Sequence, residues 1–181
     1  QGTVLPGYGA SAAGLLPASV WLTLSLHNTE DALQATVTIV NAGSRRRALF
    51  GKTYAALAGV LVLTGAALIW PAVAAAQLPA PGDLTVGIAA HLICALTGMA
   101  LGTCCIRPIF ERQGHAFAAA ALLSLVALVS RWLTPVNETV RLLSAAPPRP
   151  SSSEMVLLAV WALAMLLAVV DLAARLRQSR R

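Results

Sequence analysis

Long apolar runs constrain this chain more than any other feature of its sequence. Four of them have about the 20 residues that an α-helix needs to cross the hydrocarbon core of a bilayer. They lie at 54–76, 85–105, 115–133 and 155–174. A fifth run, at 11–27, is shorter, carries polar residues and can extend upstream to Leu5. The runs predict an all-α fold, a polytopic transmembrane helical bundle with five visible spans that forms a single transmembrane domain over 1–181.

The composition excludes an ordinary soluble domain. Hydrophobic residues make up 57% of the 181 positions, charged residues make up 11%, and the mean hydropathy is +0.74. Soluble domains average about 45–50% apolar and about 25% charged residues, so this chain has too few charges to cover a surface that faces water. The three cysteines, an odd number, indicate no disulfide framework.

The distribution of basic residues predicts the orientation in the membrane, because Lys and Arg are enriched in cytoplasmic loops. Of the 13 basic residues, ten fall in the alternate loops 28–53, 106–114 and 175–181: Arg45, Arg46, Arg47, Lys52, Arg107, Arg112, Arg175, Arg177, Arg180 and Arg181. The loops of the other side carry only Arg141 and Arg149, and Arg131 ends a span. We therefore expect a multi-pass protein of the cell membrane with a cytoplasmic C-terminus. The pI near 10.3 then reflects topology, and no nucleic-acid partner is expected.

The start of the chain suggests a further helix. This orientation places position 1 outside the cell, and no signal-peptide pattern follows it. The sequence begins at Gln1 rather than Met and enters an apolar stretch almost at once. An additional N-terminal helix that runs outward would account for both features, so six spans are expected in all.

The longest predicted cytoplasmic segment, 28–53, contains the signals of a short helix. Asn28 or Thr29 can cap its N-terminus. Glu30 and Asp31 then fall in the first turn, where the helix dipole favours acidic side chains. We therefore expect the helix to cover 30–41.

The same segment is amphipathic and ends in a basic run. Leu33, Val37 and Val40 share one face at helical spacing, and 41–44 indicates the end of the helix. The alternative interpretation is an ordinary interfacial helix that has no partner. A basic membrane anchor follows, in contact with the lipid bilayer through anionic headgroups; its members are Arg45, Arg46, Arg47 and Lys52.

The order of these features resembles the permeases of ABC exporters of the type-2 class. In that family a descending helix is followed by a short helix, a Gly-plus-basic segment and a long rising helix. The matching parts here are 11–27, 30–41, 43–52 and 54–76. Ala48-Leu49-Phe50-Gly51-Lys52 is similar to the sequence motif that the family has before the rising helix. In such permeases a Pro-x-Asn motif and a short extracellular helix precede the last span. Thr134-Pro135-Val136-Asn137 is similar to that motif, and the short helix is expected over 135–149.

The resemblance implies a membrane-spanning permease subunit of an ATP-driven exporter, which forms the translocation pathway and couples to a separate ATP-binding cassette ATPase subunit. It also implies a homodimer, or a heterodimer with a second permease. The residues that would couple to the ATPase are Glu30, Asp31, Leu33, Gln34, Val37, Val40 and Asn41. The chain has no complete phosphate loop, so we expect no enzyme activity and no cofactor here, with ATP hydrolysed on the partner.

A second hypothesis belongs to another class, a non-transporting accessory or assembly subunit of a larger membrane complex. This alternative requires no ATPase partner. A membrane-embedded enzyme is less well supported, because the sequence contains no readable Ser/His/Asp set and no paired carboxylates at one membrane depth. The spans read as nearly featureless, so lipid, peptide and hydrophobic drug are equally compatible with them as cargo.

Few polar or small residues stand out within the spans. Asp171 and Arg175 are spaced for an i,i+4 ion pair at the inner end of the last span. A metal site at His91 would need further ligands that the sequence does not supply, which favours a histidine that packs helices or lines a pore. Gly98-x-x-x-Gly102 predicts a close contact between two helices.

Overall fold

The computed structural model describes residues 5–75, 80–106, 110, 112–130, 135–144 and 152–179. Over these residues the chain forms seven α-helices and no strand. In chain order they are α1 (Leu5–Asn28), α2 (Ala32–Ala42), α3 (Arg45–Ala75), α4 (Pro81–Cys104), α5 (Gln113–Val129), α6 (Val136–Ser144) and α7 (Ser152–Ser179). The predicted all-α fold is therefore confirmed.

Four of the described helices are long and apolar enough to cross a membrane. These are α1, α3, α4 and α7, which have 24, 31, 24 and 28 residues. Helix α5 has 17 residues, fewer than the roughly 20 of a typical span. Positions 131–133 of the predicted span 115–133 lie outside the described residues. The long apolar helices are compatible with a multi-pass membrane protein.

Helix α3 differs most from its expected limits. It begins at Arg45, so the basic run forms its first turns instead of a loop before the apolar run at 54–76. The Oγ of Ser44 accepts a hydrogen bond from the backbone N of Arg47 at 3.1 Å. This bond satisfies one of the N–H groups that have no partner inside a helix start. Arginine and alanine are good helix formers, which is why the helix extends beyond its hydrophobic part.

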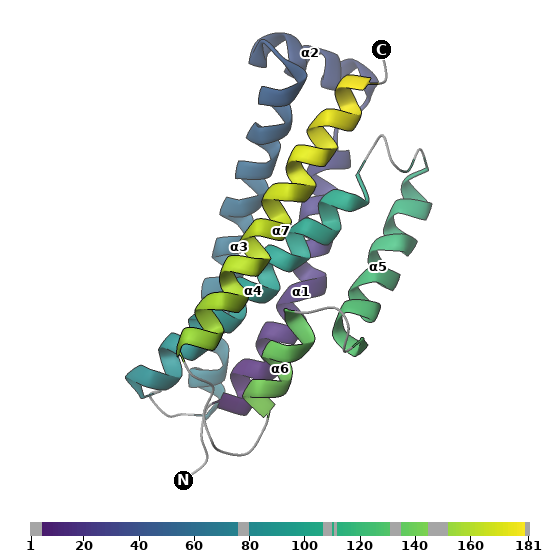
Figure 1. Cartoon of the computed structure of the whole chain (residues 1–181). Helices are drawn as coiled ribbons and strands as arrows, with labels where there is room; N and C mark the ends of the chain where they lie inside the picture. The colour runs from purple at the N-terminus through teal and green to yellow at the C-terminus, as the bar shows by residue number, and fades with distance from the viewer. Residues whose placement is uncertain are drawn as a thin grey trace.

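Figure 1 shows the long helices running in alternating directions through one bundle. Helix α2, the starts of α3 and α5 and the end of α7 lie at one end, which we call the α2 end. The start of α1 and helix α6 lie at the opposite end. The basic residues of the α3 and α5 starts and the α7 end therefore gather at the α2 end. Five of the basic residues lie outside the described residues: Arg107, Arg131, Arg149, Arg180 and Arg181.

The short helix expected over 135–149 is α6. It begins at Val136, and positions 145–149 lie outside the described residues. The side-chain Nδ2 of Asn137 donates a hydrogen bond to the carbonyl oxygen of Leu128 in α5, at 2.9 Å. This bond attaches α6 to the end of α5, and α6 also packs against α1 and α4.

The centre of the bundle is the contact between α1 and α4. A Cβ atom added at Gly98 would lie 2.6 Å from the carbonyl oxygen of Leu16, and one at Gly102 would lie 2.8 Å from that of Val20. Real Cβ atoms essentially never approach another heavy atom this closely, so only glycine allows the two backbones to approach to this distance. The predicted packing role of the glycine pair is confirmed.

Helices α1 and α4 also bury polar side chains, which corrects the expectation of nearly featureless spans. The buried polar residues of these helices include Ser19, Thr23, His27, His91, Thr97 and Thr103. Ser19, Thr23 and His27 follow one another at intervals of four, which puts them on one side of α1. That spacing was the sequence signal that could have identified a polar interface.

Large apolar side chains are exposed on the perimeter of the bundle. They include Val62 of α3, Leu122 of α5 and Leu157 of α7. A soluble monomer rarely exposes apolar surface of this extent, whereas lipid acyl chains are as apolar as leucine and solvate it without cost. The perimeter is therefore suited to a bilayer.

Candidate functional site

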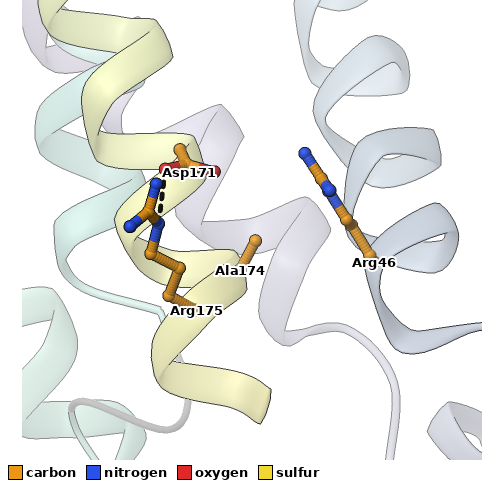
Figure 2. A pocket seen from close by; sticks show the side chains of 4 residues that line it. All are labelled: Arg46, Asp171, Ala174 and Arg175. Atoms are coloured by element: carbon orange, nitrogen blue, oxygen red, sulfur yellow. Dashed lines mark hydrogen bonds and ion pairs between the residues drawn. The ribbon is translucent and has the colours of Figure 1, made fainter. Parts of the chain in front are cut away.

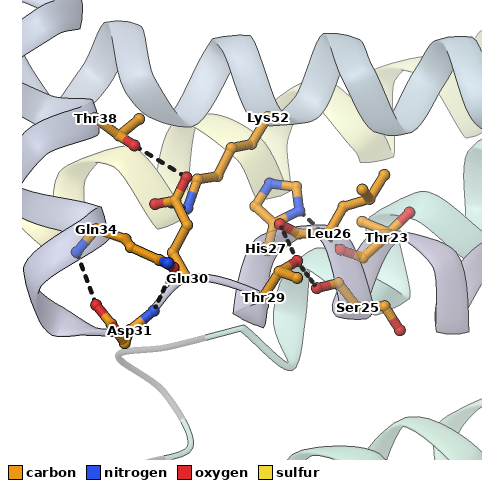
Figure 3. Close-up of polar contacts among 10 residues, drawn as sticks. All are labelled: Thr23, Ser25, Leu26, His27, Thr29, Glu30, Asp31, Gln34, Thr38 and Lys52. Carbon is orange, nitrogen blue, oxygen red and sulfur yellow. Dashed lines mark hydrogen bonds and ion pairs between the residues drawn. The ribbon is translucent and has the colours of Figure 1, made fainter.

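Helix α2 is short but capped at both ends. At its start the Oδ1 of Asp31 accepts a hydrogen bond from the backbone N of Gln34 at 2.8 Å, and the Gln34 Oε1 accepts one from the Asp31 N at 3.3 Å (Figure 3). These two bonds form a capping box. At its end Gly43 has φ 73°, a left-handed conformation that glycine adopts without steric cost. An isolated helix of 11 residues is marginal in water, so the caps contribute to its stability.

The observed N-cap corrects the prediction. Helix α1 continues to Asn28. The Oγ1 of Thr29 donates to two carbonyl oxygens in the last turn of α1, at 2.6 and 3.2 Å, and so does not cap α2. Glu30 and Asp31 precede α2 instead of forming its first turn. The expected cap at Asn28 or Thr29 is therefore wrong.

Glu30 connects this segment to α3. Its Oε2 lies 2.7 Å from the Nζ of Lys52, and its Oε1 accepts a hydrogen bond from the Oγ1 of Thr38 at 3.1 Å (Figure 3). The side chains of Lys52 and Glu30 are only 16% and 25% exposed. This shielding reduces the solvent screening that makes most surface ion pairs weak. One carboxylate thus joins the connection after α1 to both α2 and α3.

His27 forms a second connection, which the sequence reasoning missed. It is buried at the end of α1, where its Nδ1 donates a hydrogen bond to the carbonyl oxygen of Thr23 at 2.8 Å. Its Nε2 lies 3.5 Å from the Oγ1 of Thr53 in α3. The two residues are 26 positions apart, and no local pattern pairs them.

The face of α2 that points away from the bundle is apolar. Leu33, Val37 and Val40 are 74%, 53% and 72% exposed. The opposite face is half-buried and consists of Ala35, Thr38, Ile39 and Ala42. Exposed apolar side chains at helical spacing are typical of a helix that binds a groove in another protein.

The structure separates the four residues of the predicted basic anchor. Lys52 pairs with Glu30 and lies against the α2 segment. Arg45, Arg46 and Arg47 remain exposed in the first turn of α3, and the Arg46 guanidinium lies 5.5 Å from the ring centroid of Phe50. The three arginines can therefore reach lipid headgroups, whereas Lys52 acts inside the protein.

Two other groups were singled out in the sequence: His91 is buried inside the bundle, and the pair of Asp171 and Arg175 is exposed at its surface. The Nδ1 of His91 donates to the carbonyl oxygen of Gly87 at 2.7 Å, and its Nε2 lies 2.9 Å from the Oγ of Ser11 in α1. His91 thus connects α4 to α1. Within the described ranges, no group of three or more His, Cys, Asp or Glu side chains could hold a metal ion. The predicted pair of Asp171 and Arg175 is confirmed, with Oδ2 and Nε 2.7 Å apart.

Comparisons with family models, with curated proteins and with solved structures find no match for this chain. Its own geometry defines the class. Where the structure describes it, the chain is all-helical, and four of its helices are long and apolar enough to cross a membrane. Between two of these helices it carries a short capped helix with an exposed apolar face.

Proposed function

We propose that this chain is the membrane-spanning permease subunit of an ATP-driven ABC exporter of the type-2 class. The observation that carries the proposal is the geometry of α2, a capped helix between two long apolar helices. Its apolar face points outward and its base is tied to α3 by Glu30 and Lys52. The order of elements, with α6 before the last long helix, also agrees with the family that the sequence resembles.

In this proposal the chain is a cell-membrane protein whose α2 end faces the cytoplasm. The basic starts of α3 and α5 and the basic end of α7 lie there, and Lys and Arg favour the cytoplasmic side. In this arrangement α5 also crosses the membrane, which makes five spans with the four longer helices, and a further N-terminal helix would make six. The C-terminus then faces the cytoplasm, on the same side as a nucleotide-binding subunit.

The proposed mechanism is mechanical. The separate ATPase would bind Leu33, Val37 and Val40, and its closure on ATP would displace α2. The contacts of Glu30 with Lys52 and of His27 with Thr53 would transmit this movement to α3 and α1. Two permease subunits, identical or different, would form the pathway between them.

The docking test replaces both Leu33 and Val37 with Asp. Two carboxylates on the apolar face would have to lose their hydration in the interface with the ATPase, so the affinity for the ATPase is expected to fall at least about 100-fold. The measurement is affinity purification from membranes of the native host. The readouts are co-purification of a polypeptide with a complete phosphate loop and the ATPase activity that accompanies it.

The matched control is Gln113→Asp combined with Gly114→Asp. It adds the same two charges at exposed positions at the start of α5, which also lies at the α2 end. This variant is expected to retain the ATPase. Equal retention by the Leu33 and Val37 variant would contradict docking through α2. If the unmodified chain brings down no phosphate-loop protein, the accessory-subunit alternative is favoured.

Sidedness is tested separately by labelling one introduced, exposed cysteine at a time. The background is Cys104→Ser, and Cys94 and Cys105 can stay because they are buried. Gly82→Cys lies at the exposed start of α4 and Gln113→Cys at the exposed start of α5, at opposite ends of the bundle. A membrane-impermeant maleimide on intact cells is expected to label Gly82→Cys. It should label Gln113→Cys only after permeabilisation. The reverse pattern would invert the proposed topology.

A further inference from the structure

A pocket of about 390 Å³ lies between α3 and α7 at the α2 end (Figure 2). Arg46 extends from α3 toward α7, which contributes Asp171, Ala174 and Arg175. Ala174 lies between the charged groups, and its small methyl group leaves room for a ligand there.

The pocket carries a net positive charge. The Nε of Arg175 contacts the Oδ2 of Asp171 at 2.7 Å, and these two charges cancel. Because that contact uses Nε, the two terminal nitrogens of Arg175 are available as donors. Arg46 forms no ion pair within the described ranges, and its guanidinium is held 5.5 Å from the Phe50 ring. Two arginines from different helices therefore line one pocket and leave one positive charge uncompensated, a pattern suited to a phosphate group.

The position of the pocket indicates what carries the phosphate. Arg46 is at the start of the apolar α3, and Arg175 is near the end of the membrane-span candidate in α7, Ser153–Leu176. The pocket thus lies where the apolar length of the bundle ends. Leu167, Val160 and Leu157 precede Asp171 by 4, 11 and 14 residues, close to whole helical turns, and all three are exposed. An exposed apolar stripe therefore leads along α7 to the pocket.

We infer that this pocket binds the headgroup of an anionic phospholipid whose acyl chains lie along the exposed stripe of α7. The phosphodiester would accept hydrogen bonds from Arg46 and from the terminal nitrogens of Arg175. Basic pockets between transmembrane helices are known to hold anionic headgroups. The site is independent of the proposed permease function, since it needs only that α3 and α7 lie in a bilayer.

The binding test uses the full-length protein purified in an uncharged detergent and titrated with dioctanoyl phosphatidylglycerol, with microscale thermophoresis as the readout. Saturable binding is expected. Dioctanoyl phosphatidylcholine has the same chains and no net charge, and inorganic phosphate has no chains. Both should bind at least about tenfold more weakly. Inorganic phosphate lacks the apolar contact of the chains, and the choline ammonium of phosphatidylcholine offsets the charge of its phosphodiester beside the uncompensated guanidinium. Equal binding of inorganic phosphate would overturn the lipid assignment and leave a free-anion site.

Variants distinguish binding of the lipid in this pocket from a general electrostatic attraction of the lipid to the basic end of the bundle. Arg46→Gln is expected to raise the Kd for phosphatidylglycerol about tenfold, the effect of losing one partly exposed charged hydrogen bond. Asp171→Asn should lower the Kd, because it frees Arg175 and removes a repulsive carboxylate. Arg47→Gln, one residue outside the pocket, should change the Kd by no more than about twofold. Arg141→Gln on α6, at the opposite end, should leave it unchanged. If Arg47→Gln raised the Kd as much as Arg46→Gln, or if Asp171→Asn did not lower it, the assignment of the lipid site to this pocket would be overturned.

Discussion

The Gly98→Val variant is expected to lose about 3 kcal/mol of its free energy of unfolding, the upper part of the range for overpacked sites. A Cβ at this position would lie 2.6 Å from the carbonyl oxygen of Leu16 and 2.8 Å from the Cβ of Ser19. The first of these atoms belongs to the backbone and cannot move aside by a change of rotamer. Relief of the clash would require α1 and α4 to separate along the central contact of the bundle.

Thiol exposure on heating measures this effect in purified protein. In a Cys104→Ser background the remaining cysteines, Cys94 and Cys105, are buried, so a thiol-reactive fluorescent dye reports the unfolding of α4 and its surroundings. Gly65→Val is the matched control, because an added Cβ at Gly65 in α3 would meet nothing within 4 Å. Both substitutions introduce the same β-branched residue into a helix, so the intrinsic helix propensity cancels. Equal melting temperatures for the two variants would contradict the close α1–α4 contact.

The Glu30→Lys variant is expected to release α2 from α3. It removes a shielded ion pair at 2.7 Å and the hydrogen bond from Thr38, and it places two ammonium groups side by side. A charged hydrogen bond contributes about 1.5–3 kcal/mol, so we expect a loss of about 2 kcal/mol. The amides of α2 should then exchange with solvent about 30-fold faster. Hydrogen exchange read by mass spectrometry measures this rate, and ATP-driven transport by the proposed complex should fall with it.

The exchanged pair provides the decisive comparison. Glu30→Lys combined with Lys52→Glu restores opposite charges and should recover most of the slow exchange. Glu138→Lys breaks the i,i+3 pair of Glu138 with Arg141, which is more exposed, with side chains 35% and 65% accessible. Its effect on α6 should stay below about 1 kcal/mol. Failure of the exchanged pair to recover slow exchange would show that Glu30 acts through something other than Lys52. If slow exchange were recovered but transport were not, the result would count against the transport role while supporting the ion pair between positions 30 and 52.

Local features of the chain were enough to predict much of the α2 segment. The spacing of Leu33, Val37 and Val40 predicted its apolar face, and Gly43 marked its end. The N-cap was misplaced, because Asn28 and Thr29 are as suitable for capping as Asp31 when only residue type is considered. The choice depends on where α1 stops, and the hydrogen bonds of Thr29 to the last turn of α1 show that it does not end before Asn28.

The sequence by itself determined where the long helices lie, which segment between them is short and amphipathic, and where positive charge collects. Hydrophobic length, helical spacing and charge are properties of neighbouring residues, so each can be read without knowing the fold. Only the tertiary structure decided that Gly98 faces Leu16, that Glu30 meets Lys52 and that Arg46 opens onto the α7 pocket. These contacts depend on how each helix is rotated about its own axis. In a helix that is apolar on every side, the hydrophobic pattern does not specify that rotation.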